Sequence, residues 1–581
     1  MQQTTPADAA EGPEGPRSPE PGTDGPEAVG TGIVGNGTVG TESDHAAPHR
    51  HLRDAREDAV EAESEGTLLA SLRTRLHCMD LTGRTKPWLG ALLLFALALV
   101  LRLYHLGSIH ELIFDETYYV KDGWTIVHHG VEMSWPDDPD PAFTSGDVNS
   151  SEDSGEYVVH PPIGKWVIGL GMLALGGDSA WGWRISVALL GALSVLMLAR
   201  IGRRLFRSTG IGLIAGLLLA VDGLHLVMSR TSLLDLVLMF FALAAFGALL
   251  IDRDRFREGL ARSVAAARAR GEELPLLGYR AGFRPWRLSA GVLLGLACSV
   301  KWSGIYFLAV FGIMTVLWDW WARRRVGERR WWENGLFRDA VPAFVAMVGT
   351  SLVVYVASWS GWFASSKGYM RHWAEENGHA GGNPVINALR SLWHYHAQAY
   401  DFHIHLDSPH PYQANPLGWL LQIRPTNFYY RSYDYGEMGC EVEKCASQVL
   451  SVGNPLIWWF GALSILIVLV VAIWKRDGRA WAALTGIIGG YLPWLMYMDR
   501  TIFTFYSVVY EPWMILCLAY VIGLLVGSRS ADGERRLAGT LLAGSLLTLI
   551  VLVSAFFWPI WTGQVIDVDQ WEWRMWLPSW T

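Results

Sequence analysis

Two neighbouring carboxylates, Asp115 and Glu116, follow the first long apolar stretch of the chain, residues 87–106. A stretch of this length and composition can cross a bilayer, so the sequence predicts both carboxylates near a membrane surface. A carboxylate that loses part of its hydration becomes more basic, which suits a general base acting on a substrate that arrives through lipid. For such a pair taken alone, the acidic start of a solvated loop is the alternative.

The composition is that of a polytopic membrane protein. Of the 581 residues, 51% are hydrophobic, only 18% are charged and 30 are Trp. Apolar stretches of membrane-spanning length recur along the chain, and we predict an all-α fold with about eleven transmembrane helices. They are expected over residues 87–106, 183–201, 210–228, 232–251, 287–300, 303–321, 339–359, 455–474, 480–498, 504–527 and 537–558.

Basic residues cluster after three of these stretches and predict the side of the membrane on which each loop lies. By the positive-inside rule these loops are cytoplasmic, so the N-terminus is inside and, with an odd number of spans, the C-terminus is outside. The basic residues are Arg200, Arg203, Arg204 and Arg207, then Arg323, Arg324, Arg325, Arg329 and Arg330, then Lys475, Arg476 and Arg479. The two long loops, 107–182 and 360–454, are then extracytoplasmic.

An enzyme on that outer face is expected to use a donor carried in the membrane, because nucleotide sugars and ATP are not available there. The sequence agrees with this expectation, since no Gly-rich phosphate loop follows a predicted strand. We therefore expect no soluble cofactor and no nucleic-acid partner.

The chain divides into segments of different composition. The Gly/Pro/Glu-rich residues 1–65 are predicted to form a disordered cytoplasmic tail. The other expected segments are a juxtamembrane amphipathic piece at 66–86, an N-terminal transmembrane catalytic module at 87–359, a second outer loop at 360–454, a C-terminal four-helix module at 455–558 and a Trp-rich outer tail at 559–581. The Trp residues of that tail favour an interfacial helix or an aromatic belt.

Five basic side chains are predicted at the outer ends of the spans, on the same face as Asp115. For each alone, a side chain that snorkels to the lipid headgroups is the alternative. Together they suit a lipid-phosphate donor, because cations neutralise the phosphate and stabilise it as it leaves. These residues are Lys165, Arg184, Arg230, Lys301 and Arg500. The residues from His160 to Lys165 open a short apolar segment that ends by Gly177, and we expect this segment to be an interfacial helix.

Four motifs occur in a fixed order along the chain. They are Phe114-Asp115-Glu116, the segment from His160 to Lys165, the segment from Ser229 to Asp235 and the segment from Cys298 to Gly304. In this order they resemble the actinobacterial protein O-mannosyltransferases, which have the multi-spanning GT-C architecture. The likeness extends from Pro87 to Thr581. The loop 360–454 is too short for the β-trefoil-type repeats that the eukaryotic relatives carry.

The resemblance implies an inverting transfer of mannose from polyprenyl-phosphate-mannose to Ser or Thr of proteins leaving the cell, on the outer face of the plasma membrane. It assigns Asp115 as the general base and Glu116 as a residue that positions the acceptor or the sugar, and these two roles are exchangeable. Residues expected to position donor or acceptor are His160, Asp235, His403 and His410. A lipid phosphate is a good leaving group, so cations suffice and no general acid is needed. The implied partners are membrane lipid, the lipid-linked donor, exported acceptor proteins and the secretion machinery.

Two other functions compete with this interpretation. A different GT-C transferase would move a sugar from a lipid phosphate to a glycolipid or polysaccharide, and an acidic residue in the first loop would serve there too. A transporter or lipid flippase would show internal repeats and ionisable residues at mid-membrane depth, and neither is apparent.

The second outer loop contains His pairs at i and i+2 and two cysteines. The pairs His394/His396 and His403/His405 would project from one side of an extended strand and could bind a metal. No carboxylate pattern completes a recognised site, so we expect an aromatic layer near the membrane and no metal. Cys440 and Cys445 lie in an oxidising location, which favours a disulfide over a free pair or a metal clip.

Overall fold

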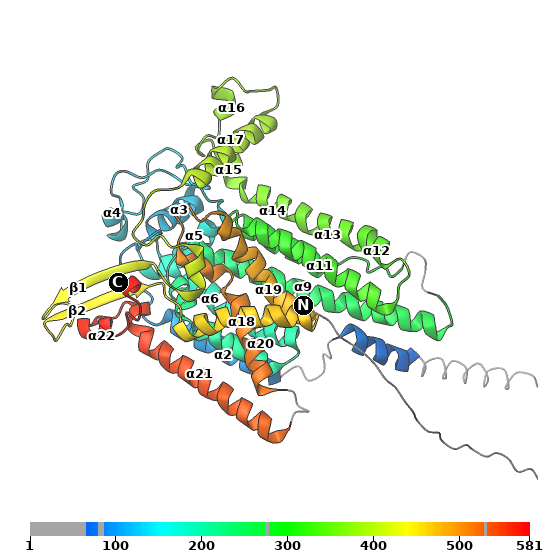
Figure 1. Ribbon diagram of the computed structural model, residues 1–581. Helices are drawn as coiled ribbons and strands as arrows, with labels where there is room; N and C mark the ends of the chain where they lie inside the picture. Colours follow the sequence, from blue (N-terminus) through cyan, green and yellow to red (C-terminus); the bar gives the residue numbers. More distant parts are fainter. Residues whose placement is uncertain (1–64, 79–85, 274–277, 528–531) are drawn as a thin grey trace, which may run out of the picture. The chain divides into compact units, whose positions relative to one another are not determined.

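The computed structural model describes residues 65–78, 86–273, 278–527 and 532–581. They lie in one compact unit, residues 61–581. The predicted disordered tail falls outside the described residues except for Glu65. Figure 1 shows long helices lying side by side, with a small sheet and short helices gathered near one end of them.

Helices occupy every range that the sequence predicts to cross the bilayer. They are α2 (Lys86–Leu103), α6 (Ala180–Phe206), α7 (Thr209–Val221) with α8 (Gly223–Met228), α9 (Leu234–Ala269), α10 (Pro285–Cys298), α11 (Gly304–Val326), α12 (Trp331–Asn334) with η1 (Gly335–Ala340), α13 (Val341–Phe344), η2 (Val345–Gly349) and α14 (Thr350–Ser358), α18 (Pro455–Trp474), α19 (Gly478–Gly490) with η4 (Leu492–Met496), η5 (Thr504–Val509) with α20 (Glu511–Val526), and α21 (Gly533–Thr562). Six of these helices are long and apolar enough to cross a membrane, and four more are apolar but shorter.

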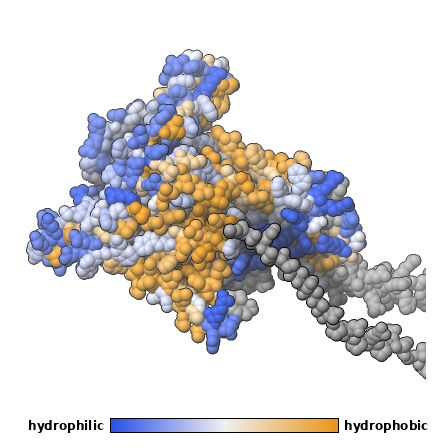
Figure 2. Space-filling view, viewed as in Figure 1, coloured by the Kyte–Doolittle hydropathy of each residue, from blue (hydrophilic) through white to orange (hydrophobic). Residues whose placement is uncertain are grey.

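The outer surface of these helices is apolar in the middle. In Figure 2 hydrophobic residues gather over the central part of the visible face, and hydrophilic residues gather toward its edges. Exposed leucines and valines recur on α2, α14, α18 and α21. Large apolar side chains turned outward on helices of this length are expected of a surface that faces lipid.

The basic residues of the three predicted cytoplasmic loops come together in space. Arg207, Arg325 and Arg479 lie close enough to His77 for their charges to lower its pKa, after the larger effect of burial. Each residue comes from a different predicted loop, and His77 precedes the first span. We call this the arginine end of the bundle. The end that carries residues 104–179 and 359–454 is the loop end.

The juxtamembrane segment forms a helix over residues 65–76. Its Leu72 and Leu76 are buried against Phe256 and Leu260 of α9. This part of the predicted amphipathic piece therefore packs on protein with its apolar face.

The first outer loop contains α3 (Glu116–His129), α4 (Asp140–Thr144) and α5 (Ile163–Leu175). The expected interfacial helix is α5, which packs against α3 and α6. At the crossing of α3 and α5, a Cβ built on Gly169 would stand 2.3 Å from the carbonyl oxygen of Gly123. Gly169 thus permits a close backbone approach that a Cβ at this position would block, and α5 is held on the protein.

The second outer loop is helical where the metal hypothesis needs it to be extended. It contains α15 (Ser360–Ala364), α16 (Trp373–Glu376), α17 (Pro384–His405), η3 (Pro416–Leu421) and two strands. His394, His396, His403 and His405 all lie on α17, where residues i and i+2 point to different sides. The condition for a metal site, an extended segment with both His side chains on one side, is therefore not met.

A small antiparallel sheet departs from the all-α expectation, so the fold is mostly helical. It has the strand order β1 (Asn427–Asp434), β2 (Lys444–Leu450), β3 (Ile566–Asp567), with Tyr430 opposite Gln448. A disulfide joins Cys440 and Cys445 at the β1–β2 turn.

The Trp-rich tail folds back onto the second outer loop. After β3 it forms α22 (Val568–Glu572) and η6 (Pro578–Trp580). Trp580 is buried, and its indole nitrogen donates to the carbonyl of Gln422 at 2.7 Å. The expectation of an interfacial helix or belt is therefore wrong for Trp580, which belongs to the core, whereas Trp573 is exposed.

Candidate active site

Asp115 stands at the start of α3, where an aspartate usually caps the helix with its side chain. Here it makes no such capping bond. Its carboxylate instead accepts a hydrogen bond from the hydroxyl of Tyr119, one helical turn later. Within the part of the chain that the structure describes, Asp115 makes no ion pair. Burial raises the pKa of Asp115 to about 6, against the opposing charge of Lys301. A partly buried carboxylate of that pKa is suited to act as a general base.

Glu116 has a different environment from its neighbour. Its side chain is fully buried and receives a two-pronged contact from Arg184, with Nε–Oε1 2.8 Å and Nη2–Oε2 2.6 Å. The backbone N–H groups of Ser232 and Ile113 also donate to it, at 2.8 and 3.1 Å. Glu116 therefore joins α3, α6 and the turn before α9, and its oxygens are already occupied by protein donors.

A second carboxylate, Asp235, lies beside Asp115 and is paired with Lys301. The Lys301 ammonium lies 2.8 Å from Asp235 Oδ2 and 4.9 Å from the ring centre of Tyr506. Asp235 is in the first turn of α9 and Lys301 is in the turn before α11. The charge of Lys301 acts on Asp115, so this ammonium is near the predicted base.

Two histidines and an arginine lie near Lys301. The rings of His160 and His403 are stacked with centroids 5.2 Å apart. His403 Nε2 donates to the carbonyl of Val159 at 3.0 Å, and its Nδ1 accepts from Arg500 Nη2 at 3.1 Å. Burial, and then the charge of Arg500, lower the pKa of His403 to about 4. His403 is therefore neutral, and it orients the Arg500 guanidinium.

The five predicted phosphate ligands separate into two groups. Lys165, Lys301 and Arg500 surround His160, whose pKa is lowered first by burial and then by their charges. Arg184 and Arg230 lie instead around the backbone between α2 and α3. Arg230 donates to the carbonyls of Arg102, Tyr104 and His105, and Arg184 donates to those of Ile109 and Glu111.

Lys165 is surrounded by carboxylates. It forms an ion pair with Glu132 and donates to the carbonyl of His160 at 3.0 Å. Asp122 and Glu156 share a hydrogen bond nearby, and burial raises the pKa of both. Lys165 is 1% exposed, so its charge is largely balanced inside the protein.

His410 lies in a cluster of aromatic rings beside the site. Its ring is 6.0 Å from Phe114 and 4.9 Å from Phe503, edge-on in both cases. Phe428 of β1 and Phe505 of η5 contact Phe114 at 5.0 and 5.5 Å. We call Phe114, His410, Phe428, Phe503 and Phe505 the aromatic cluster.

Sequence reasoning missed several residues of this arrangement. Tyr119 is four residues after Asp115, so helical periodicity could have placed the two side chains together. No comparable signal marks Phe428, Phe503, Phe505 and Tyr506, because they lie more than 300 positions after Asp115 in the chain.

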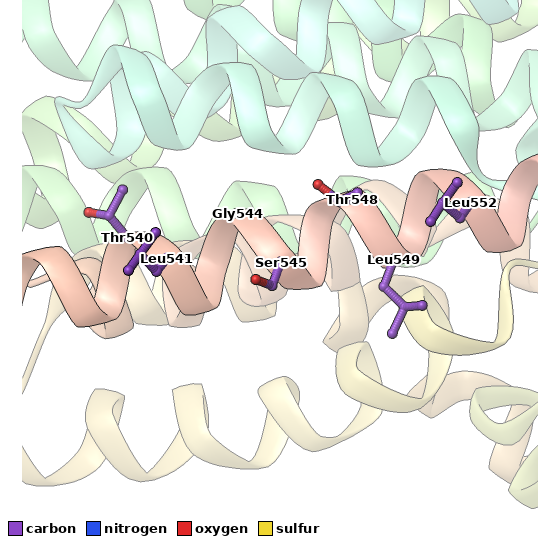
Figure 3. A pocket seen from close by; sticks show the side chains of 7 residues that line it. All are labelled: Thr540, Leu541, Gly544, Ser545, Thr548, Leu549 and Leu552. Carbon is purple, nitrogen blue, oxygen red and sulfur yellow. The ribbon is translucent and has the colours of Figure 1, made fainter.

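A small space lies beside His160. Its volume of about 10 Å³ holds about one water molecule. It is lined by Val158, Val159, His160, Pro161, Trp302, Trp359, Tyr395, His396 and Ala399. A groove of about 480 Å³ runs along α21, and Figure 3 shows that all of its lining residues come from that helix. That groove contains none of the site residues. Among the described residues no group of three His, Cys, Asp or Glu side chains could hold a metal ion.

The arrangement can therefore activate a hydroxyl and bind an anion. Asp115 supplies a carboxylate that makes no ion pair among the described residues. Lys301 and Arg500 supply positive charge close to His160 and His403. A base with cations nearby suits a direct displacement in which a phosphate leaves.

Comparisons with known proteins show the family to which the chain is similar. Residues 92–259 match the family described as dolichyl-phosphate-mannose-protein mannosyltransferase, and residues 388–580 match the C-terminal four-helix region of protein-O-mannosyltransferase. The polyprenol-phosphate-mannose–protein mannosyltransferase of Mycobacterium tuberculosis is 37% identical over 86% of this chain and 92% of its own length. That of Corynebacterium glutamicum is 34% identical over 81% and 88%.

The fold is also found in a solved structure. The yeast protein O-mannosyltransferase Pmt1-Pmt2 complex bound to the sugar donor gives a TM-score of 0.65 with 15% identity, covering 88% of this chain and 94% of that one. This likeness confirms the mostly helical GT-C type of architecture. By its sequence identity to the bacterial relatives over nearly their whole length, the chain belongs to the family of polyprenol-phosphate-mannose–protein mannosyltransferases.

Proposed function

We propose that the protein transfers mannose from polyprenyl-phosphate-mannose to Ser or Thr hydroxyls of exported proteins, with inversion and with Asp115 as the general base. The family supports the reaction, since the bacterial relatives carry it in their names. The observation that supports the base is the contrast at α3, where Asp115 makes no ion pair within the described ranges and Glu116 is fully engaged.

The mechanism is a single displacement. Asp115 accepts the proton of the acceptor hydroxyl, whose oxygen attacks the anomeric carbon of mannose. The bond from that carbon to the phosphate oxygen breaks on the opposite side, and the phosphate leaves with the electron pair. Attack opposite the leaving group inverts the sugar configuration, and the cations stabilise the phosphate, so no acid is required.

Arg500 and Lys301 are the phosphate ligands in this proposal. Arg500 uses one nitrogen for His403, and its buried Nε has no partner among the described residues. Lys301 has one carboxylate partner and lies near the base. The contacts of Arg184, Arg230 and Lys165 support structural roles for them, and the carbonyl contacts fix the loop that presents Asp115. The proposed mechanism has no step that uses a metal, and the assay in EDTA described below tests whether a divalent ion is required.

The topology follows the predicted eleven spans, with the arginine end in the cytoplasm and the loop end outside. The convergence of the three basic loops around His77 supports this orientation. The active site then faces the exterior of the plasma membrane. Acceptor hydroxyls are accessible in unfolded chains, so transfer coupled to the secretion machinery fits this location.

The test is a transfer assay in membranes with radiolabelled polyprenyl-phosphate-mannose and a Ser/Thr-rich peptide. We expect label on the peptide with wild type, retained in EDTA, and a loss of about 10²- to 10⁴-fold with Asp115→Asn. Because the Asp115 base is protonated below a pKa of about 6, wild-type kcat/KM should fall as pH drops below that value. Label found only in lipid or polysaccharide would favour the other GT-C reaction, and full activity of Asp115→Asn would remove the assigned base.

A further inference from the structure

Phe114, the residue before the proposed base, has an unusual backbone conformation. Its φ is 53°, in the left-handed region that bulky side chains rarely adopt. Such a conformation is strained for a residue with a side chain and persists only where the surroundings hold it. Because Asp115 is the next residue, the conformation of Phe114 determines the direction in which the Asp115 side chain leaves the backbone.

Hydrogen bonds hold the chain on both sides of Phe114. The N–H of Glu116 donates to the carbonyl of Ile113 at 3.1 Å, and the N–H of Ile113 donates to Glu116 Oε2 at 3.1 Å. These bonds close the turn over residues 113–116, but none of them contacts the Phe114 ring. Another part of the protein must fix that ring.

The aromatic cluster supplies this contact. Phe428, Phe503 and Phe505 approach the Phe114 ring at 5.0, 5.6 and 5.5 Å, and His410 approaches at 6.0 Å. Phe428 and Phe505 are themselves buried. Edge-on and tilted aromatic pairs at these distances are favourable beyond the burial of the rings. They therefore act against the backbone strain at Phe114.

The cluster joins two separate parts of the sequence. Phe114 belongs to the region matched by the N-terminal mannosyltransferase family, and the other four residues belong to the region matched by the C-terminal family. The ring contacts therefore make the position of the proposed base depend on residues about 300–390 positions later in the chain, in the second outer loop and before α20.

We propose that the aromatic cluster holds Phe114 in its left-handed conformation and thereby positions the Asp115 carboxylate, which makes Phe428 and Phe503 positioning residues for the transfer reaction. This inference rests on the proposed role of Asp115. A carboxylate displaced by about 1 Å from its productive position lowers the rate by as much as about 100-fold.

The cluster also affects the protonation of the base. Burial is the largest cause of the raised Asp115 pKa, and the charged or titratable groups that face Asp115 are Lys301, Asp235, Tyr119 and Tyr506. None of these four groups belongs to the cluster. Opening the cluster admits water to Asp115 without removing a charge, so the acid limb of the kcat/KM profile should move to lower pH.

The experiment compares Phe428→Leu and Phe503→Leu with the conservative Phe428→Tyr and with Phe311→Leu. Phe311 is a matched control, since it is buried among the rings of Phe246, Phe307 and Trp513 away from the site. We expect Phe428→Leu and Phe503→Leu to lower kcat per folded molecule about 10- to 100-fold, with donor and acceptor KM within about twofold of wild type. Their acid limbs should move to lower pH, and Phe428→Tyr should behave as wild type.

A Phe114→Gly variant keeps the left-handed conformation available but removes the ring. It should show the same loss of kcat, whereas full activity would mean that the backbone conformation alone suffices and would overturn the proposal. Normal kcat and an unchanged acid limb in folded Phe428→Leu and Phe503→Leu would also overturn it. Asp115→Asn is assayed in parallel to separate the two hypotheses. An active Asp115→Asn would refute the role of Asp115 as the general base. An inactive Asp115→Asn together with a fully active Phe428→Leu would refute only the positioning role of the aromatic cluster.

Discussion

Two groups of buried charges each include one aspartate of α9, and they differ in how completely their charges are paired. Asp235 of the site is in the first turn of α9, and Asp252 is 17 residues later (252 − 235), about 25 Å along the axis. Asp252 contacts Arg284 at 2.6 Å and Arg287 at 3.3 Å. Asp319 contacts the same two arginines, each at 2.6 Å. We call these four residues the arginine cluster.

The site leaves some of its charges unpaired, whereas the arginine cluster does not. Each carboxylate of the arginine cluster has two arginine partners. At the loop end, within the described ranges, Asp115 has only the Tyr119 hydroxyl, and Arg500 has a neutral His403. Burying a charge without an opposite partner is unfavourable, so such an arrangement is expected where a substrate supplies the partner. The comparison assigns stability to one end of α9 and chemistry to the other.

The largest effect should come from breaking the arginine cluster. Arg287→Met leaves Asp252 and Asp319 with one arginine between them, which should lower the free energy of unfolding by about 3–5 kcal/mol. The remaining folded protein should keep its transfer rate per molecule, because the cluster does not contact the site. Thermal unfolding in detergent and active-site-normalised kcat measure the two quantities.

The matched control for that variant is Arg262→Gln. Arg262 pairs with Glu258 at 2.9 Å, but it is 63% exposed, so its loss should change stability by less than about 0.5 kcal/mol. A fall in kcat per folded Arg287→Met molecule would contradict the division of roles between the two ends of α9, with stability at one end and chemistry at the other.

The next largest effect concerns the adjacent carboxylates. Glu116→Gln should cost about 2 kcal/mol of stability, because Arg184 loses its buried counter-ion. Asp115→Asn should cost none at neutral pH. A carboxyl whose pKa is raised on folding favours the folded state at low pH, and this contribution is lost as pH rises from about 4 to about 6. The amide of Asn does not titrate in this range, so the stability of Asp115→Asn does not fall in this way as pH rises.

Unfolding curves of both variants at pH 5 and pH 7.5 provide the measurement. Equal destabilisation by Asp115→Asn and Glu116→Gln would show that the two residues share one structural role, against the contrast drawn here.

The sequence predicted the positions of the helices well, because the hydropathy of each local segment indicates where a helix lies. It did not predict which charges pair. Glu116 and Arg184 are 68 residues apart, and Lys301 and Asp235 are 66 apart, so their contacts depend on how the helices pack. Five cations at the outer ends of spans all looked alike in the sequence, although backbone carbonyls occupy Arg230 and carboxylates surround Lys165.

In the second outer loop the local sequence pattern did not determine the secondary structure. Its His residues gave a pattern that fits either a strand or a helix, and α17 is a helix. The third strand of the small sheet, β3, comes from the far end of the chain after α21. Neither the pairing of β2 with β3 nor the aromatic contacts of Phe114 leave a periodic signal in the local sequence.

The smallest effect should separate Arg500 from Arg230. Arg500→Lys keeps the positive charge but loses the planar fork of donors, so we expect the donor KM to rise about tenfold with kcat within about threefold of wild type. Arg230→Lys is the matched control. Its guanidinium donates to three backbone carbonyls, and its replacement should lower stability and leave the donor KM unchanged. Steady-state kinetics with varied polyprenyl-phosphate-mannose measure both. If Arg230→Lys raised the donor KM and Arg500→Lys did not, the phosphate would bind at the loop before α3, and the unpaired Arg500 nitrogen would need another explanation.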